Sequence, residues 1–375
     1  MKFDPDAIGT LVIKIGTSLL SGQRAFEGHV MESVVKEICL LKQAHQLNVL
    51  IVSSGAIGCG MNTLKMARRP ETLPEKQAVA AVGQATLMHY YETLFMTYGE
   101  GLHSAQVLLT LRDLDQRDSY LNLRNTIQNL FAMKSIIPIV NENDSTAVDQ
   151  LRFGDNDTLA AKIAAKLGAG LLIILSDIDG LYAGNPQEDP DAAHIPEVAE
   201  ITPQIEDYAG GAGTLTGTGG MRTKLVAAKI AWAAGVPAII ANGHAPNVIT
   251  GVLGGGVRCT HFKPGESALP SRKRWIAFGR TVQGVLTIDE GARNAIVNQG
   301  RSLLPAGITG CSGNFAAGDA VEIRDAAGAP IARALVHFSN IELARIMGRQ
   351  SHEITAILGE KPYNEVVHRD NLVLI

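Results

Sequence analysis

Short apolar runs alternate with amphipathic segments along the first two thirds of the chain. The runs are rich in β-branched residues, which predicts strands at 10–16, 49–54, 105–110, 136–140, 171–176 and 236–243. Between them, apolar residues recur at three- and four-residue steps, as in 29–46, and predict helices. This alternation indicates an α/β fold with an open, mostly parallel sheet sandwiched by helices. Because the runs are apolar nearly throughout, we expect these strands to be covered on both faces.

The pattern changes near residue 262. A segment rich in proline, serine and charge follows, and we interpret 266–277 as a linker after a first domain at 1–265. Beyond it, short strand-like runs at 284–288, 319–323 and 330–338 are separated by glycine-containing turns. We therefore expect a small β-rich domain at 278–375, which includes the C-terminal tail.

Composition narrows the class of protein. The chain is 46% hydrophobic and 19% charged with a net charge of −4, which is typical of a globular protein and excludes a polyanion binder as a whole. The four cysteines have no CxxC spacing, so we expect neither a zinc site nor a disulfide framework. The thiols are scattered, as in proteins of a reducing compartment, and the N-terminus has no apolar signal segment. The apolar runs are too short to span a bilayer. We therefore expect a cytoplasmic protein without a membrane segment.

Polar residues that could carry chemistry follow the predicted strands, where open α/β sheets bind ligands. Lys14 lies inside an apolar run, and a buried lysine is unfavourable unless it is paired or faces a ligand; the alternative is an edge-strand lysine that reaches solvent. Gly16 would let backbone N–H groups approach an anion there. Ser54 and Gly55 end the next run, in a turn that suits a carboxylate or phosphate or is an ordinary strand-to-helix turn.

Carboxylates gather after the strand at 136–140. Five acids lie within 142–157: Glu142, Asp144, Asp149, Asp155 and Asp157. Asp144 and Asn156 could hold an ammonium group. Asp157 precedes a helical pattern and could simply be its N-cap, and a solvated loop is the alternative for the whole cluster.

Two more clusters favour a nucleotide. Ser176 and Asp177 end the run at 171–176, where they would contact a nucleotide or close a turn. Glycines recur through 210–220 before a helix that we expect to start near Met221, and the N–H groups of a helix start bind phosphates. The spacing matches neither the Walker nor the dinucleotide-binding pattern. Lysines, glycine loops, acids and amides at one sheet edge therefore suggest phosphoryl transfer to a small anionic acceptor.

Seven segments resemble those of the amino acid kinase family, in the family's order: VIKIGTSLL, VSSGAIGCG, AAVGQATLM, NENDSTAV, FGDNDTLAA, LSDIDGLY and GTGGMRTK. Within that family they are most similar to the members that phosphorylate the γ-carboxylate of L-glutamate. The tail, with LTIDEGARNAI, RSLLPAGI and GNFAAGDAVEI, resembles the PUA domain that many bacterial members of this group carry.

The resemblance implies a phosphotransferase with a carboxyl group as acceptor. It would use ATP and Mg²⁺ to make L-glutamyl 5-phosphate, the first step of proline biosynthesis, under feedback inhibition by proline. Lys14 and Lys224 would contact the phosphates, and Asp157 would hold both lysines in place. The implied substrate-binding residues are Ser54, Asn141, Asp144 and Asn156, with Arg152 as a mobile contributor. The implied ATP-binding residues are Lys14, Ser176, Asp177, Thr218, Gly219, Gly220, Met221, Arg222, Thr223 and Lys224, and no protein ligand to a metal is implied.

The resemblance also implies partners and leaves alternatives. We expect a homo-oligomer, with glutamyl-phosphate reductase as a partner and without membrane contact. The resemblance does not decide whether the tail binds RNA. One alternative is another kinase of the family, acting on aspartate, acetylglutamate, carbamate or UMP; NEND with GDND and the tail favour glutamate. The other is an RNA-binding or regulatory protein with an inactive kinase domain, against which the presence of Lys14, Asp157 and Lys224 argues.

Overall fold

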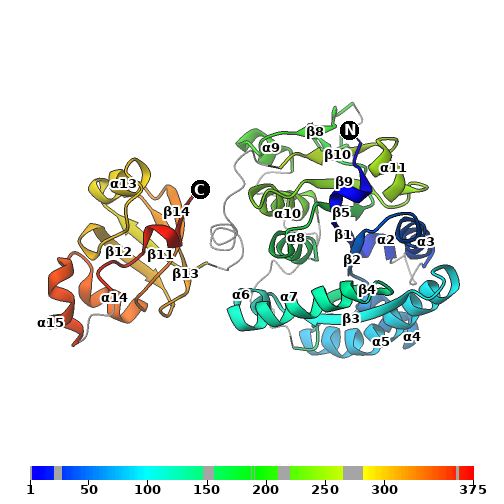
Figure 1. The fold of residues 1–375 in the computed structure, drawn as a ribbon, viewed down its shortest axis with the longest axis horizontal. Coiled ribbons are helices and arrows are strands. Elements are labelled where there is room, and N and C mark those ends of the chain that lie inside the picture. Colours follow the sequence, from blue (N-terminus) through cyan, green and yellow to red (C-terminus); the bar gives the residue numbers. More distant parts are fainter. Residues whose placement is uncertain are drawn as a thin grey trace. The chain divides into compact units, whose positions relative to one another are not determined.

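The computed structural model describes residues 2–20, 28–146, 156–186, 188–189, 191–209, 220–264, 282–359 and 363–375, without the side chains at positions 117 and 118. The chain divides into two compact units, Met1–Ala268 and Leu269–Ile375, each described here by itself (Figure 1). The expected linker at 266–277 lies outside the described residues. In the described ranges, no helix is long and apolar enough to cross a membrane.

A mostly parallel sheet forms the centre of the first unit, in the order β3-β4-β2-β1-β5-β9-β10-β8. The strands are β1 (Thr10–Ile15), β2 (Asn48–Ser53), β3 (His103–Leu109), β4 (Ile136–Glu142), β5 (Leu171–Ser176), β8 (Glu197–Val198), β9 (Ala238–Asn242) and β10 (Cys259–Phe262). Only the β9–β10 pair of this sheet is antiparallel. All six predicted strands are confirmed. The short strands β8 and β10 were not predicted, nor was the small hairpin of β6 (Leu181–Tyr182) and β7 (His194–Ile195).

Helices cover both faces of this sheet, as predicted (Figure 1). One apolar core lies between the sheet and α2 (Thr17–Leu20), α3 (His29–Ala44), α4 (Ala56–Thr63), α5 (Leu73–Tyr98) and α11 (Val248–Gly254). The other lies against α6 (Leu111–Asp115), α7 (Arg117–Ala132), α8 (Asn156–Leu167) and α10 (Met221–Ala233), with α9 (Pro203–Tyr208) at its margin. A short helix, α1 (Pro5–Ile8), precedes β1. Side chains of β1 alternate between these cores, because successive side chains of a strand point to opposite faces.

The prediction that every strand is covered on both faces is wrong for β3. This strand is the edge of the sheet and pairs only with β4 among the described strands. Most of its residues are exposed or half-buried, and only Leu109 is fully buried. An apolar run therefore does not by itself distinguish a central strand from an edge strand.

The second unit is built on its own five-stranded sheet, in the order β12-β11-β13-β14-β15. The strands are β11 (Val282–Ile288), β12 (Ile308–Gly313), β13 (Ala320–Arg324), β14 (Pro330–Leu335) and β15 (Leu372–Leu374). The helices α13 (Glu290–Val297), α14 (Asn340–Ile346) and α15 (Ile354–Leu358) complete it, and a separate apolar core fills it. The predicted small β-rich fold after the linker agrees with this arrangement.

Two glycines let the backbones of α4 and α5 touch. A Cβ atom at Gly83 would lie 1.8 Å from the carbonyl oxygen of Ala56, and one at Gly60 would lie 2.0 Å from that of Val79. No side chain larger than hydrogen fits at either position without moving a helix. Because Gln84 follows Gly83, this close crossing also determines how deeply Gln84 enters the protein.

We expect Gly83→Ala to lower the free energy of unfolding by roughly 2 kcal/mol or more, because the added methyl group forces α4 and α5 apart. Alanine inside a helix normally stabilises a protein by about 0.5–1 kcal/mol relative to glycine. A loss of stability in Gly83→Ala would therefore indicate a clash between the two helices. The matched control is Gly254→Ala at the end of α11, where nothing lies within 4 Å of the added atom. Urea denaturation followed by circular dichroism compares the two. A Gly83→Ala protein at least as stable as the control would contradict the close crossing.

Candidate active site

The side chain of Lys14 lies on the face of the sheet that α8 and α10 cover. It is the next-to-last residue of β1, and it shares a face with Val12, whose side chain lies in the core beneath those helices. Ile13 and Ile15 point to the opposite core. The predicted lysine inside a buried strand is confirmed, and its alternative, an exposed edge-strand lysine, is wrong: β1 is central and Lys14 is 2% exposed.

Asp157 joins two lysines from different elements. Its Oδ1 forms an ion pair with the Lys14 ammonium group, and its Oδ2 lies 3.3 Å from Nζ of Lys224 on α10. The hydroxyl of Thr223 also lies 2.9 Å from Oδ2, as a donor. Asp157 is completely buried and Lys224 is 4% exposed. Buried charges are tolerated only when they are paired and hydrogen-bonded, so these contacts explain how three ionisable groups remain inside the protein.

The interpretation of Asp157 as an N-cap is wrong. Helix α8 begins at Asn156, so Asp157 is inside its first turn. Its carboxylate contacts side chains of β1 and α10 instead of capping the N-terminus of its own helix. A carboxylate near a helix N-terminus is still favoured by the helix dipole, which adds to its stability there.

The start of α10 lies next to these lysines through Lys224 and Thr223. Helix α10 begins at Met221 as predicted, after Gly220, which has extended backbone and makes no side-chain cap. The N–H of Thr223 donates to the Gly220 carbonyl at 3.1 Å, and the N–H groups of a helix start are in general suited to an anion. Met221 is half-buried and Arg222 exposed. Thr218 and Gly219 lie outside the described residues, as do Asp149, Arg152 and Asp155.

Ser176 and Asp177 lie at the same edge, one strand away from Lys14. Ser176 is the last residue of β5, which pairs with β1, and Gly16 N donates to the carbonyl of Leu175 at 3.2 Å. The Ser176 hydroxyl donates to Asp177 Oδ1 at 2.9 Å. Ser176 is buried whereas Asp177 is exposed. The structure thus brings both residues to the edge where the lysines lie.

A chain of amides connects α8, β4 and α5. Asn156 Nδ2 lies within 2.9 Å of both the Ser53 carbonyl and the Ser54 hydroxyl, and 3.0 Å from Asn141 Oδ1. Asn141 Nδ2 in turn donates to Gln84 Oε1 at 2.9 Å. Three of the four predicted substrate-binding residues are therefore in direct contact: Ser54, Asn141 and Asn156. We call this connected set, with Gln84, the amide relay.

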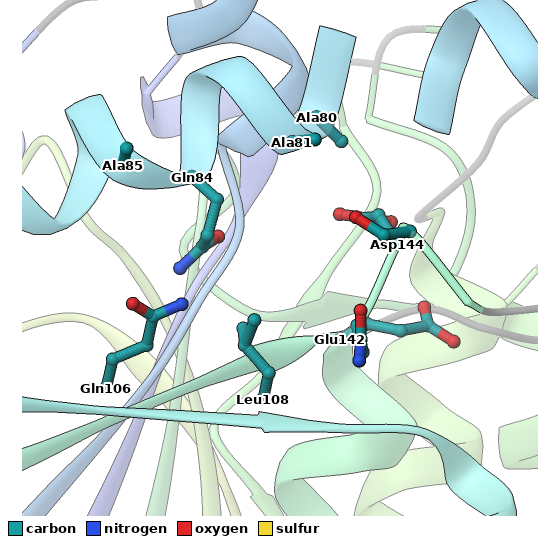
Figure 2. A pocket seen from close by; sticks show the side chains of 10 residues that line it. Ala80, Ala81, Gln84, Ala85, Gln106, Leu108, Glu142 and Asp144 are labelled. Atoms are coloured by element: carbon teal, nitrogen blue, oxygen red, sulfur yellow. The ribbon is translucent and has the colours of Figure 1, made fainter. Parts of the chain in front are cut away.

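Asp144, the fourth predicted substrate-binding residue, lies in a pocket beside the relay (Figure 2). The pocket has a volume of about 250 Å³. It is lined by α5, β3 and the end of β4: Ala80, Ala81, Gln84, Ala85, Gln106, Leu108, Glu142, Asn143, Asp144 and Ser145. Burial raises the pKa of the Asp144 carboxyl above its ordinary value. An ammonium group in the pocket would favour the ionised form again.

Sequence reasoning missed Gln84, which is part of both the relay and the pocket. A signal was present: Gln84 is a lone amide in the buried stripe of α5, whose other members include Ala80, Leu87 and Tyr91. No separate role was assigned to Ser53, whose hydroxyl contacts the Tyr91 hydroxyl at 2.8 Å while its carbonyl accepts from Asn156. Neither partner is near in sequence, so only the fold reveals these contacts.

Among the residues that the structure describes, no group of three or more His, Cys, Asp or Glu side chains is placed to hold a metal ion. The Asp157 carboxylate is bound to two ammonium groups. Lys14 and Lys224 thus bring two ammonium groups to this end of the sheet.

Known proteins resemble the chain over nearly its whole length. The model of the amino acid kinase family matches residues 9–242, and that of the PUA domain matches residues 284–358. A glutamate 5-kinase of Caldanaerobacter subterraneus is 45% identical over 97% of both chains. Those of Moorella thermoacetica and Picosynechococcus are 46% identical (97% of this chain, 96% of the relative) and 44% identical (98% of each). The chain belongs to the amino acid kinase family.

Proposed function

We propose that the protein phosphorylates the γ-carboxylate of L-glutamate with ATP, giving L-glutamyl 5-phosphate and ADP. The main support is the arrangement at the carboxyl ends of β1, β2 and β4. A buried carboxylate there holds two lysines beside a helix start, and the amide relay leads from that carboxylate's helix to a pocket with Asp144. The relatives at 44–46% identity are glutamate 5-kinases, and this supports the same acceptor.

The lysines would neutralise the charge that opposes the reaction. A carboxylate and a triphosphate repel one another, and catalysis of phosphoryl transfer is mostly positioning and charge stabilisation. Lys14 and Lys224 bring two ammonium groups to the same carboxylate, and ammonium groups also bind phosphates. In this proposal the two ammonium groups and the first N–H groups of α10 contact the phosphates, and Ser176 and Asp177 contact the nucleotide with the 218–224 segment.

The chemical step needs no general base. A γ-carboxylate oxygen of glutamate attacks the γ-phosphorus of ATP, an O–P bond forms, and the bond to the bridging oxygen of ADP breaks with its electron pair. The attacking carboxylate is already ionised at neutral pH, since its ordinary pKa is about 4.3. The residues of the site therefore have to orient two anions and stabilise the transferring group.

The amide relay and Asp144 would hold the amino acid. Asp144 would accept hydrogen bonds from the α-ammonium group, and Ser54, Asn141 and Asn156 would fix the rest of the molecule. Proline carries the same ammonium and carboxylate groups on one carbon, so it would compete in the same pocket. A homo-oligomer and transfer of the product to a glutamyl-phosphate reductase belong to this proposal as well.

Mg²⁺ is part of the proposed reaction through the nucleotide. Magnesium usually retains water and binds through substrate phosphates with one or two carboxylates. In this proposal the phosphates of ATP hold the ion.

The assay that tests the function measures ADP release by the purified chain with ATP and Mg²⁺. L-glutamate, L-aspartate, N-acetylglutamate, carbamate and UMP are compared as acceptors, and hydroxylamine traps an acyl phosphate. We expect turnover with glutamate alone, with trapped hydroxamate and suppression by proline. Turnover with a different acceptor only would retain phosphoryl transfer and reject glutamate as the substrate.

Lys224→Ala should lower kcat by on the order of 10²-fold or more, because a charge contact to the transferring phosphoryl group is lost. Lys14 remains to pair with Asp157, so the fold should persist. The matched control is Lys229→Ala on the same helix, an exposed lysine whose partner is Glu206. Steady-state kinetics of both variants test the role. A Lys224→Ala enzyme with the kcat of the control would remove Lys224 from the chemistry.

Asp144→Asn should raise the KM for glutamate while leaving the melting temperature at pH 8 unchanged or higher. The substitution removes the ammonium partner, and it also removes a carboxylate that burial disfavours. Because the folded pKa of Asp144 is raised, its ionisation destabilises the fold above that pKa and the cost disappears as the pH falls below its ordinary value. The stability gain of the variant should therefore shrink on acidification. Calorimetry at pH 8 and pH 4 follows it, and an unchanged KM would exclude Asp144 from the substrate site.

A further inference from the structure

Gln84 lines the pocket and carries a hydrogen-bond donor there. The sequence motifs assigned no role to this residue. Its side chain is 9% exposed, and it lines the pocket from α5. Its Oε1 accepts from Asn141, whereas its Nε2 is buried and has no hydrogen-bond partner among the described residues. Buried amide N–H groups are normally paired, so this donor calls for an acceptor that enters the pocket.

Backbone groups at the far end of the relay determine which way the Gln84 amide points. The Ser53 carbonyl can only accept, so the atom of Asn156 that faces it is the nitrogen. The N–H of Glu142 can only donate, at 2.8 Å, so the atom of Asn141 that faces it is the oxygen. The Asn141 nitrogen must then be the donor to Gln84, and the atom of Gln84 that accepts this hydrogen bond must be its oxygen. The Gln84 nitrogen is therefore left on the other side of the carboxamide.

Charges in the pocket indicate what kind of molecule would meet this donor. Figure 2 shows Gln84 and Gln106 on one side and Glu142 and Asp144 on the other. The acids favour a cation, and the Gln84 N–H favours an acceptor, so the two sides together fit a molecule with an ammonium group and a carboxylate close to each other. An α-amino acid has this arrangement on a single carbon.

We propose that Gln84 determines specificity by donating a hydrogen bond from Nε2 to the α-carboxylate of the acceptor amino acid. This inference rests on the proposed function. Gln84 takes no part in the bonds that change; it discriminates between acceptors that carry an α-carboxylate and acceptors that lack one. The γ-carboxylate, which reacts, lies toward Lys14 and the relay.

Gln106 is the competing partner for this donor. Its side chain is exposed and lines the same pocket from β3. Rotation of its carboxamide by half a turn would present an oxygen instead of a nitrogen toward Gln84, and a hydrogen bond between the two glutamines would make Gln84 a structural residue. An experiment on Gln84 must therefore separate recognition of the substrate from support of the pocket.

The test uses Gln84→Glu with two competing acceptors. Glutamate at position 84 keeps an oxygen for Asn141 and replaces the donor by a negative oxygen, so the relay is preserved and only the pocket side changes. L-glutamate is compared with 4-aminobutyrate, which has the same amine and the same reacting carboxylate but no α-carboxylate. The KM of glutamate and the Ki of 4-aminobutyrate as its competitor are measured for each protein, with the melting temperature as a control for folding.

We expect Gln84→Glu to raise the KM of glutamate at least about tenfold, which is the lower range for a hydrogen bond to a charged group. The Ki of 4-aminobutyrate should stay within about twofold of the unmodified protein. Gln84→Met, which also loses the contact with Asn141, should weaken both ligands, glutamate more strongly. Gln106→Met is the control at the neighbouring glutamine on the same side of the pocket, and it should not change the ratio of the two constants.

Equal weakening of both ligands by Gln84→Glu, or a selective loss with Gln106→Met instead, would overturn the proposal. These results differ from a failure of the proposed function. An unmodified chain that releases no ADP with glutamate contradicts the function itself. An unmodified chain that is active, with the two constants rising together in Gln84→Glu, contradicts only the role of Gln84.

Discussion

The buried carboxylate of Asp157 is the interaction on which the arrangement of the site depends. It reaches Lys14 on the central strand β1 and Lys224 on α10, and neither lysine could remain inside the protein without an anion. The ion pairs also connect three elements that are distant in sequence. Packing of apolar side chains alone would tolerate small shifts of α8 and α10 along the sheet. The two ion pairs of Asp157 tolerate only much smaller shifts of these helices. They therefore determine the positions of α8 and α10 relative to β1.

Much of the fold could be predicted because most strands are buried on both faces and have short apolar sequences. Five of the six predicted strands are confirmed for this reason, all except β3. The start of α10 at Met221 was predictable from the glycine-rich segment that precedes it. The strand β10, with the sequence CTHF, was missed because two of its four residues are polar although Thr260 and His261 are buried. β3 shows the opposite error: four of its last five residues, Ala105, Val107, Leu108 and Leu109, are apolar, but it lies at the edge of the sheet.

The site was predictable only as far as charged and glycine-rich residues follow strands. Lys14, Ser54, Asn141, Asp157 and Ser176 could be selected because each occurs where a strand ends or a helix begins. Gln84 could not be selected in this way, since it lies in the middle of a helix of 26 residues and its partner Asn141 is 57 positions away. Its contact depends on the close crossing of α4 and α5, which no local pattern reveals.

Asn156 and Asp157 are adjacent in the chain, yet they belong to the two different halves of the site. Asn156 contacts Ser54 and Asn141 on the side that we propose for the acceptor, and Asp157 is bound to the lysines on the side that we propose for the phosphates. The two halves therefore share a single peptide group at the start of α8. A molecule that shifts the backbone at Asn156 would therefore also move the neighbouring carboxylate, to which both ammonium groups are bound. An ill-fitting acceptor would consequently be penalised twice, once in its own binding and once in the alignment of the phosphate that it should receive.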